Sequence, residues 1–87
     1  MAEQSARHPD PKEQPGADWR YRIVSTPGVV GGKPRIDGTR IWVGLILGWL
    51  ASGETVDWVL EQYPDLTRDD VLACLAYARD LTTEHAA

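Results

Sequence analysis

Two stretches with helical periodicity are separated by only three residues, Pro64, Asp65 and Leu66. In the first stretch, residues 55–63, apolar side chains recur at the i, i+3, i+4, i+7 spacing of one buried helix face. The second stretch starts at Thr67 and shows a similar apolar stripe. So short a connection forces a sharp corner between two amphipathic helices. The sequence therefore predicts a helix-turn-helix unit.

The ends of both helices carry recognisable signals. Thr55 suits the N-cap of the first helix, and Pro64 is expected to end it. Thr67 and Asp70 have the spacing of a capping box, with Asp in the place of Glu or Gln. Every third or fourth residue of the second helix is apolar, and we expect these residues to form its buried face: Val71, Cys74, Leu75, Ala78 and Leu81.

A further helix is predicted over residues 43–52, with Gly53 as its C-terminal cap. Its apolar residues lie nearly all round, with Leu45 and Trp49 opposite the face that should meet the core. So small a domain cannot cover every side of such a helix with its own chain, which favours a homodimer. The residues expected at a dimer or partner interface are Trp42, Leu45, Trp49 and Trp58. For Trp58, packing on the N-terminal tail or on the hairpin is an equal alternative.

The N-terminal part divides into a tail and a β element. Residues 1–18 are rich in proline and polar side chains, which predicts a disordered tail before a compact domain at 19–82 and a frayed end at 83–87. Residues 21–24 are β-prone, and residues 29–41 read as a glycine-punctuated hairpin or ribbon. Turns that need positive φ explain the glycines of this ribbon, Gly31, Gly32 and Gly38, better than a ligand does.

The composition argues against several classes of protein. No apolar run is long enough to span a membrane and no secretory h-region precedes the domain, so we expect no membrane contact and a cytoplasmic protein. The glycines before Lys33 fail the phosphate-loop template, because Pro34 stands where Ser or Thr is required. The two histidines, His8 and His85, share no metal-ligand spacing with other residues, and Cys74 is expected in the core. The sequence therefore predicts no enzyme, no metal and no cofactor.

The charge distribution bears on DNA binding. Residues 21–44 hold four basic residues against one acidic, whereas residues 45–87 hold two basic against eight acidic. The first turn of the would-be recognition helix contains Asp69 and Asp70, and carboxylates repel phosphate. Any DNA contact is therefore expected from three basic residues of the ribbon: Lys33, Arg35 and Arg40. The alternative is that these arginines pair with helix carboxylates such as Glu54 or Asp57.

The run TPGVVGGKPRIDGTRI at residues 26–41, followed by a helix and by YPDLT at residues 63–67, closely resembles a small prokaryotic family known as domain of unknown function 433. The resemblance covers roughly residues 23–80. It implies a mainly α, three-helix, homeodomain-like helix-turn-helix bundle behind a short N-terminal β-hairpin. It also implies proteins often encoded beside a PIN-like toxin, and no catalytic residues.

The sequence therefore leaves two functions open. One is an antitoxin-type binding module that dimerises and covers a PIN-like toxin, with autoregulatory DNA binding left open. The other is a stand-alone helix-turn-helix regulator that binds DNA. Acid-rich helices and surplus apolar helix surface favour the first, and the basic ribbon keeps the second open.

Overall fold

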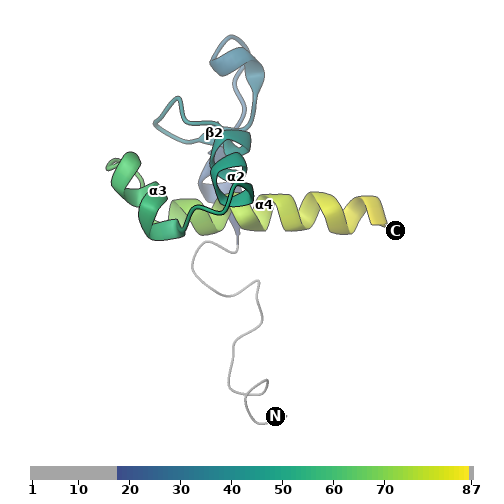
Figure 1. Cartoon of the computed structure of the whole chain (residues 1–87). Coiled ribbons are helices and arrows are strands. Elements are labelled where there is room, and N and C mark those ends of the chain that lie inside the picture. The colour runs from purple at the N-terminus through teal and green to yellow at the C-terminus, as the bar shows by residue number, and fades with distance from the viewer. Residues whose placement is uncertain (1–17, 87) are drawn as a thin grey trace.

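A computed structural model describes residues 18–86 of the chain, with side chains from residue 18 to residue 83. As predicted, the fold is mainly α: three helices follow a short antiparallel hairpin (Figure 1). The helices are α2 (Val43–Ala51), α3 (Val56–Gln62) and α4 (Arg68–Ala86). The strands are β1 (Ile23–Val24) and β2 (Arg35–Ile36), and two 3₁₀ turns, η2 (Trp19–Tyr21) and η3 (Val30–Gly32), flank β1 on either side along the chain. The tail expected at residues 1–18 lies outside the described residues apart from Asp18, whose carboxylate caps η2.

The sheet is small, but its buried side chains attach the ribbon, residues 29–41, to the helices. β1 and β2 are antiparallel, with Ile23 opposite Ile36, and both of these side chains are buried in the core. After a tight turn at Gly38, Trp42 returns to form a bridge with Arg35. The three ribbon glycines have the positive φ that a turn role requires, 64° at Gly31, 79° at Gly32 and 80° at Gly38.

The helix caps follow the sequence signals. Thr55 accepts a hydrogen bond from the Trp58 backbone N–H at 3.0 Å. At the start of α4, the Asp70 N–H donates to Thr67 Oγ1 at 3.2 Å, and the Thr67 N–H donates to the Asp70 carboxylate at 2.9 Å. The predicted capping box is therefore confirmed, with Asp doing what Glu or Gln usually does.

α4 is the element on which the rest of the fold packs. α2, α3, β1 and η2 all contact it, and Figure 1 shows it running past them toward the C-terminus. We call residues 68–74 its inner part and residues 75–86 its outer part. The inner part contributes Val71 and Cys74 to the core, both fully buried. The helix continues to Ala86, beyond the boundary at residue 82 expected for the compact domain.

The predicted buried face of α4 is right for the inner part and wrong farther along. Leu75 and Leu81 are 41% and 40% exposed, and Ala78 is only partly buried. The side of the outer part that is buried instead carries Ala76 and, partly, Tyr77, onto which Trp19 of η2 packs. The reason is geometric: the buried face of α4 follows Ala73, Cys74, Ala76 and Tyr77, so it is rotated around the helix from the predicted face and leaves Leu75 on the opposite side.

Candidate functional site

Two tryptophans of the neighbouring helices α2 and α3 lie against each other. Trp49 on α2 and Trp58 on α3 lie with ring centroids 5.1 Å apart, tilted by 59°. The Trp49 indole Nε1 also donates a hydrogen bond of 2.9 Å to the hydroxyl of Tyr63, at the end of α3. Both tryptophans are partly buried against the core. Their own chain therefore covers much of both rings.

This arrangement corrects two expectations. Trp49 was expected on an uncovered face of α2, but α3 crosses that side and supplies Trp58 and Tyr63. Trp58 packs on α2, which is neither of the own-chain sites considered, the tail and the hairpin. The residues that α2 exposes are small ones instead: Gly44, Gly48 and Ala51.

Trp42 extends the aromatic surface to the ribbon. It occupies the N-cap position of α2 with an extended backbone, φ −89° and ψ 153°. The Lys33 ammonium lies 5.0 Å from its ring centroid, within cation–π range. Leu45, one turn farther along α2, is partly buried and stands outside the core cluster. We call Trp42, Leu45, Trp49 and Trp58 the aromatic strip, because it runs from the ribbon across α2 to α3.

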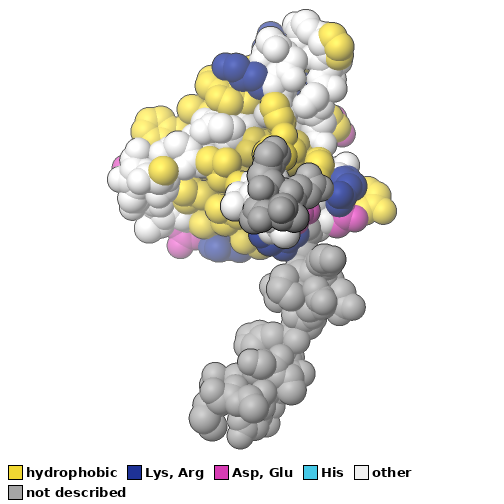
Figure 2. Space-filling view, turned by 90° about the vertical axis from the view of Figure 1, so that its right-hand side faces the viewer, with side chains coloured by type: hydrophobic (Ala, Val, Ile, Leu, Met, Phe, Trp, Pro, Cys, Tyr) yellow, Lys and Arg dark blue, Asp and Glu magenta, His cyan; other side chains and the backbone are white. Residues whose placement is uncertain are grey.

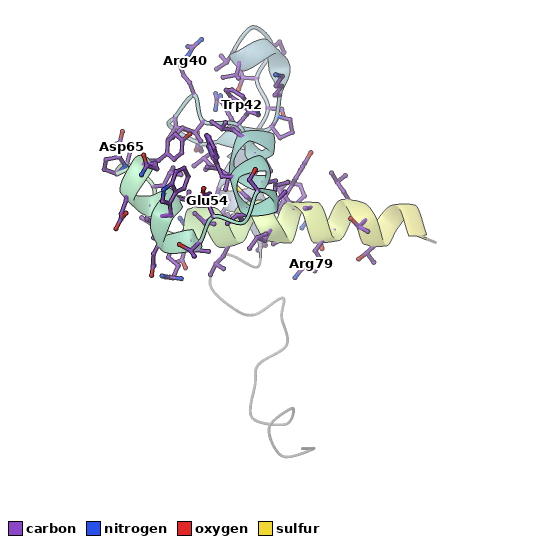
Figure 3. All side chains as sticks on the ribbon, in the orientation of Figure 1. Arg40, Trp42, Glu54, Asp65 and Arg79 are labelled. Carbon is purple, nitrogen blue, oxygen red and sulfur yellow. The ribbon has the colours of Figure 1, made fainter. Side chains whose placement is uncertain are left out.

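The three basic residues of the ribbon have different environments. Arg35 is partly buried, and its Nη2 donates to Thr26 Oγ1 at 3.1 Å. Its Nε and Nη1 are buried with no hydrogen-bond partner among the described residues. Lys33 lies over Trp42, whereas Arg40 is exposed and reaches outward from the ribbon (Figure 3). The structure thus leaves Lys33 and Arg40 as the ribbon cations at the surface.

The ion pairs suggested for the ribbon arginines are wrong in their partners. Within residues 18–83, Arg35 bonds to a threonine and Arg40 forms no ion pair. Asp57 pairs with Arg68 instead, across the turn between α3 and α4. Figure 3 shows Glu54 at the turn between α2 and α3, well away from Arg40.

The arginine that joins the β element to α4 is Arg22, directly before β1, which sequence reasoning did not single out. Its guanidinium lies 3.1 Å from the Asp70 carboxylate and 3.7 Å from that of Asp69. Asp70 is therefore both a cap residue and half of a largely buried ion pair, its side chain being 13% exposed. The two carboxylates in the first turn of α4 were a local signal for an ion pair. The partner of Asp70, however, is Arg22, which lies 48 residues away in the sequence.

The single thiol offers no reactive group. Cys74 is fully buried, and burial, followed by the nearby Asp70 carboxylate, raises its pKa to about 12. It packs in the core, as the sequence predicted. The described residues contain no group of three or more His, Cys, Asp and Glu side chains arranged to hold a metal ion.

Across residues 18–86, no helix is both long enough and apolar enough to cross a bilayer.

Comparison with known proteins gives consistent matches. The model for a protein family of unknown function, DUF433, matches residues 23–78. The uncharacterized protein y4eO of Sinorhizobium fredii (strain NBRC 101917 / NGR234) is 32% identical over 59 residues, which make up 68% of this chain and 27% of that protein. This chain thus spans about a quarter of that relative's length. The crystal structure of a DUF433 member protein from Anabaena variabilis ATCC 29413 superposes with a TM-score of 0.69 at 29% identity, covering 95% of this chain and 86% of that one.

Proposed function

Because this chain belongs to the DUF433 family, whose function is unknown, its role has to come from its own surfaces, and we propose an antitoxin-type binding module. In this proposal the module dimerises in the cytoplasm and uses the aromatic strip to bind a PIN-like toxin. The observation that carries the proposal is the strip itself, which presents three partly exposed tryptophans and a leucine across three elements.

Such a surface has the composition of a protein interface. Tryptophan and tyrosine are enriched at the centres of interfaces, where a few large side chains supply most of the binding free energy. The Trp49–Tyr63 hydrogen bond and the Trp49–Trp58 contact hold the rings in place before a partner arrives. A fixed side chain loses less conformational entropy on binding than a mobile one, so this part of the strip suits tight association.

The charge of the helices indicates the kind of partner. Residues 45–87 carry two basic residues against eight acidic, and Leu45, Trp49 and Trp58 of the strip belong to this segment. A nuclease binds a polyanion and therefore presents a basic groove, which an acidic protein with an aromatic centre complements. This is the electrostatic relation expected between a toxin of that class and the protein that covers it.

The proposed role is not catalytic. The one thiol is buried with a raised pKa, and the region between Trp19 and Asp80 has no histidine to act as a base. Binding alone accounts for the residues described.

The test is direct binding to the product of the neighbouring gene, which this proposal expects to be a PIN-like protein. Leu45→Glu should weaken binding at least about 100-fold, because it places a charge in the centre of a dry interface without disturbing the core cluster. Thr83→Glu adds the same charge on the exposed outer part of α4 and should change the affinity less than about threefold. Equal affinity of wild type and Leu45→Glu would refute the strip as the toxin-binding surface.

A second role, autoregulatory DNA binding through the ribbon, is proposed on one observation: Lys33 and Arg40 are exposed at its surface. Neutralising either should weaken binding to all DNA sequences, and should lower the slope of log affinity against log salt concentration by about one for each phosphate no longer neutralised. Asp69→Asn is the matched probe of α4, since Asp70 also builds the cap. Loss of DNA binding in Asp69→Asn, with no change in the ribbon variants, would place the DNA contact on α4.

A further inference from the structure

Arg35 carries hydrogen-bond donors that the protein itself does not use. Among residues 18–83, the buried side-chain nitrogen and oxygen atoms that lack a hydrogen-bond partner both belong to Arg35: they are Nε and Nη1. Its remaining nitrogen, Nη2, donates to Thr26 Oγ1 at 3.1 Å. A buried donor of a charged group costs free energy when it is unpaired, because it has lost its hydration without gaining an acceptor. The stability of the free protein therefore does not explain why an arginine stands at this position.

The sheet determines which groups surround Arg35. Arg35 lies opposite Val24 of β1 and forms a bridge with Trp42, so these three side chains project from the same face of the sheet. The core isoleucines of the two strands occupy the other face. The ammonium of Lys33 lies 5.0 Å from the ring centroid of Trp42. This face thus combines two cations with an indole, and Figure 2 shows Lys and Arg side chains at the surface of the upper part of the molecule, beside hydrophobic ones.

The positive charge of the ribbon has no carboxylate to balance it. Within residues 18–83, none of its three cations, Lys33, Arg35 and Arg40, takes part in an ion pair. A single carboxylate would suit Arg35 alone. Three cations within residues 33–40 fit a ligand with several negative charges along a chain, and phosphate is the oxyanion that arginine binds in this setting.

The loop between β1 and β2, residues 25–34, is held weakly in its present position. Thr26 ties it to Arg35 through one exposed hydrogen bond. Val30 has a φ of 50°, which is strained for a β-branched residue. A Cβ added at Gly28, Gly31 or Gly32 would meet nothing within 4 Å, so the loop lies in open space, and Figure 1 shows it at the end of the molecule farthest from α4. A shift of this loop would uncover the guanidinium at little cost in packing.

We propose that Arg35 is the centre of a phosphate-binding site on the ribbon, and that the β1–β2 loop moves to uncover its guanidinium when a phosphate group binds. The phosphate oxygens then accept hydrogen bonds from the guanidinium, while Lys33 and Arg40 bind neighbouring phosphates of the same chain. The inference rests on the second proposed role, DNA binding through the ribbon, and deepens it by adding a buried residue to the two exposed cations.

The first experiment is a titration of the full chain with inorganic phosphate at constant ionic strength, followed by proton–nitrogen NMR. The Arg35 Nε–H signal, identified by its absence from the spectrum of Arg35→Met, should shift and reach saturation. The amide signals of the loop glycines should shift with it, because the loop has to move. Arg20→Met removes an exposed arginine of η2 and is the matched control, in which the titration should be unchanged. An Arg35 signal that does not respond to phosphate would overturn the proposal.

The second experiment separates a binding role from a structural one. Arg35→Met removes a charge with unpaired donors and keeps an apolar side chain, so its thermal unfolding midpoint should equal or exceed that of wild type. Its loop glycine signals should no longer respond to phosphate. A lower midpoint combined with an unchanged response of the loop glycines would show that Arg35 is a structural residue, and would refute the site.

The third experiment measures the affinity for a DNA duplex of mixed sequence. Arg35→Met should weaken it about 10- to 100-fold, because hydrogen bonds to a charged group are lost, whereas the exposed Arg40→Met should weaken it less than about fivefold. If wild type binds phosphate at Arg35 but does not bind DNA, the site holds and the autoregulatory role fails. If Arg35→Met binds DNA as tightly as wild type, the autoregulatory role holds and the site at Arg35 is refuted.

Discussion

The inner and outer parts of α4 belong to one continuous helix but are held in different ways. The inner part is held by a reciprocal cap at its first turn, by the Arg22–Asp70 ion pair, and by Val71 and Cys74 in the core. The outer part is covered along one side only among the described residues, where Trp19 packs edge-on against Tyr77 with centroids 4.7 Å apart. The difference shows that burial along a helix depends on which of its sides the neighbouring elements cover, and not on the apolar pattern alone.

The largest loss of stability is expected from substituting the cap residue Asp70. Asp70→Ala removes a cap acceptor and leaves Arg22 without its closest carboxylate, so it should lower the free energy of unfolding by about 3 kcal/mol. Asp69→Ala, which removes only a longer and more exposed ion pair, should cost less than about 0.5 kcal/mol. Urea denaturation of both variants measures the difference. Equal losses would mean that the inner part is not held by its cap.

A smaller loss of stability is expected from truncating apolar residues on either side of the boundary between the inner and outer parts of α4. Val71→Ala should cost about 2 kcal/mol, because the deleted methyl groups are fully buried and leave a cavity. Leu75→Ala deletes a larger group, yet its exposed position should limit the loss to about 0.5 kcal/mol when measured on monomeric protein. A larger loss at Leu75 than at Val71 would contradict the division of α4 into an inner and an outer part.

The smallest effect is the pH dependence of stability that Asp80 contributes in the outer part of α4. Hydrogen bonds from Arg79 and then from Trp19 hold the pKa of Asp80 below its ordinary value. Because the folded pKa is the lower one, this carboxylate stabilises the fold above the unfolded pKa, and the contribution disappears as pH falls through the folded pKa. Asp80→Asn keeps an oxygen for the Trp19 indole but cannot titrate. The stability difference between wild type and Asp80→Asn should therefore be largest near neutral pH and shrink in acid, as urea denaturation at several pH values would show.

The local features of the fold could be predicted from the sequence, and the long-range ones could not. The Thr55 cap, the box formed by Thr67 and Asp70, and the end of α3 before Pro64 each depend on residues within a few positions of one another. The pairing of Arg22 with Asp70 joins residues 48 apart, and no spacing rule marks it.

The candidate sites show the same division. Periodicity grouped Leu75 with Val71 and Cys74, but the buried face of α4 is rotated away from Leu75. It also could not show that α3 crosses over Trp49. Helical spacing describes a face, whereas cover depends on the direction and length of other elements. The large hydrophobic side chains that the described residues expose are therefore Leu75 and Leu81 on α4 and Tyr21 of η2, and not Trp49 on α2.

The hydrogen bond between Trp19 and Asp80 also has a consequence for the order of folding. It joins residues 61 apart, so it closes the longest loop among the side-chain hydrogen bonds of the described residues. Loop-closure entropy favours the shorter-range contacts of the helices first, and we expect the N-terminal turn to dock onto α4 last. Trp19→Phe should accordingly speed unfolding while leaving the folding rate nearly unchanged in stopped-flow kinetics. The core would then form before the N-terminal turn docks onto α4, and this turn would be the first element to undock on unfolding.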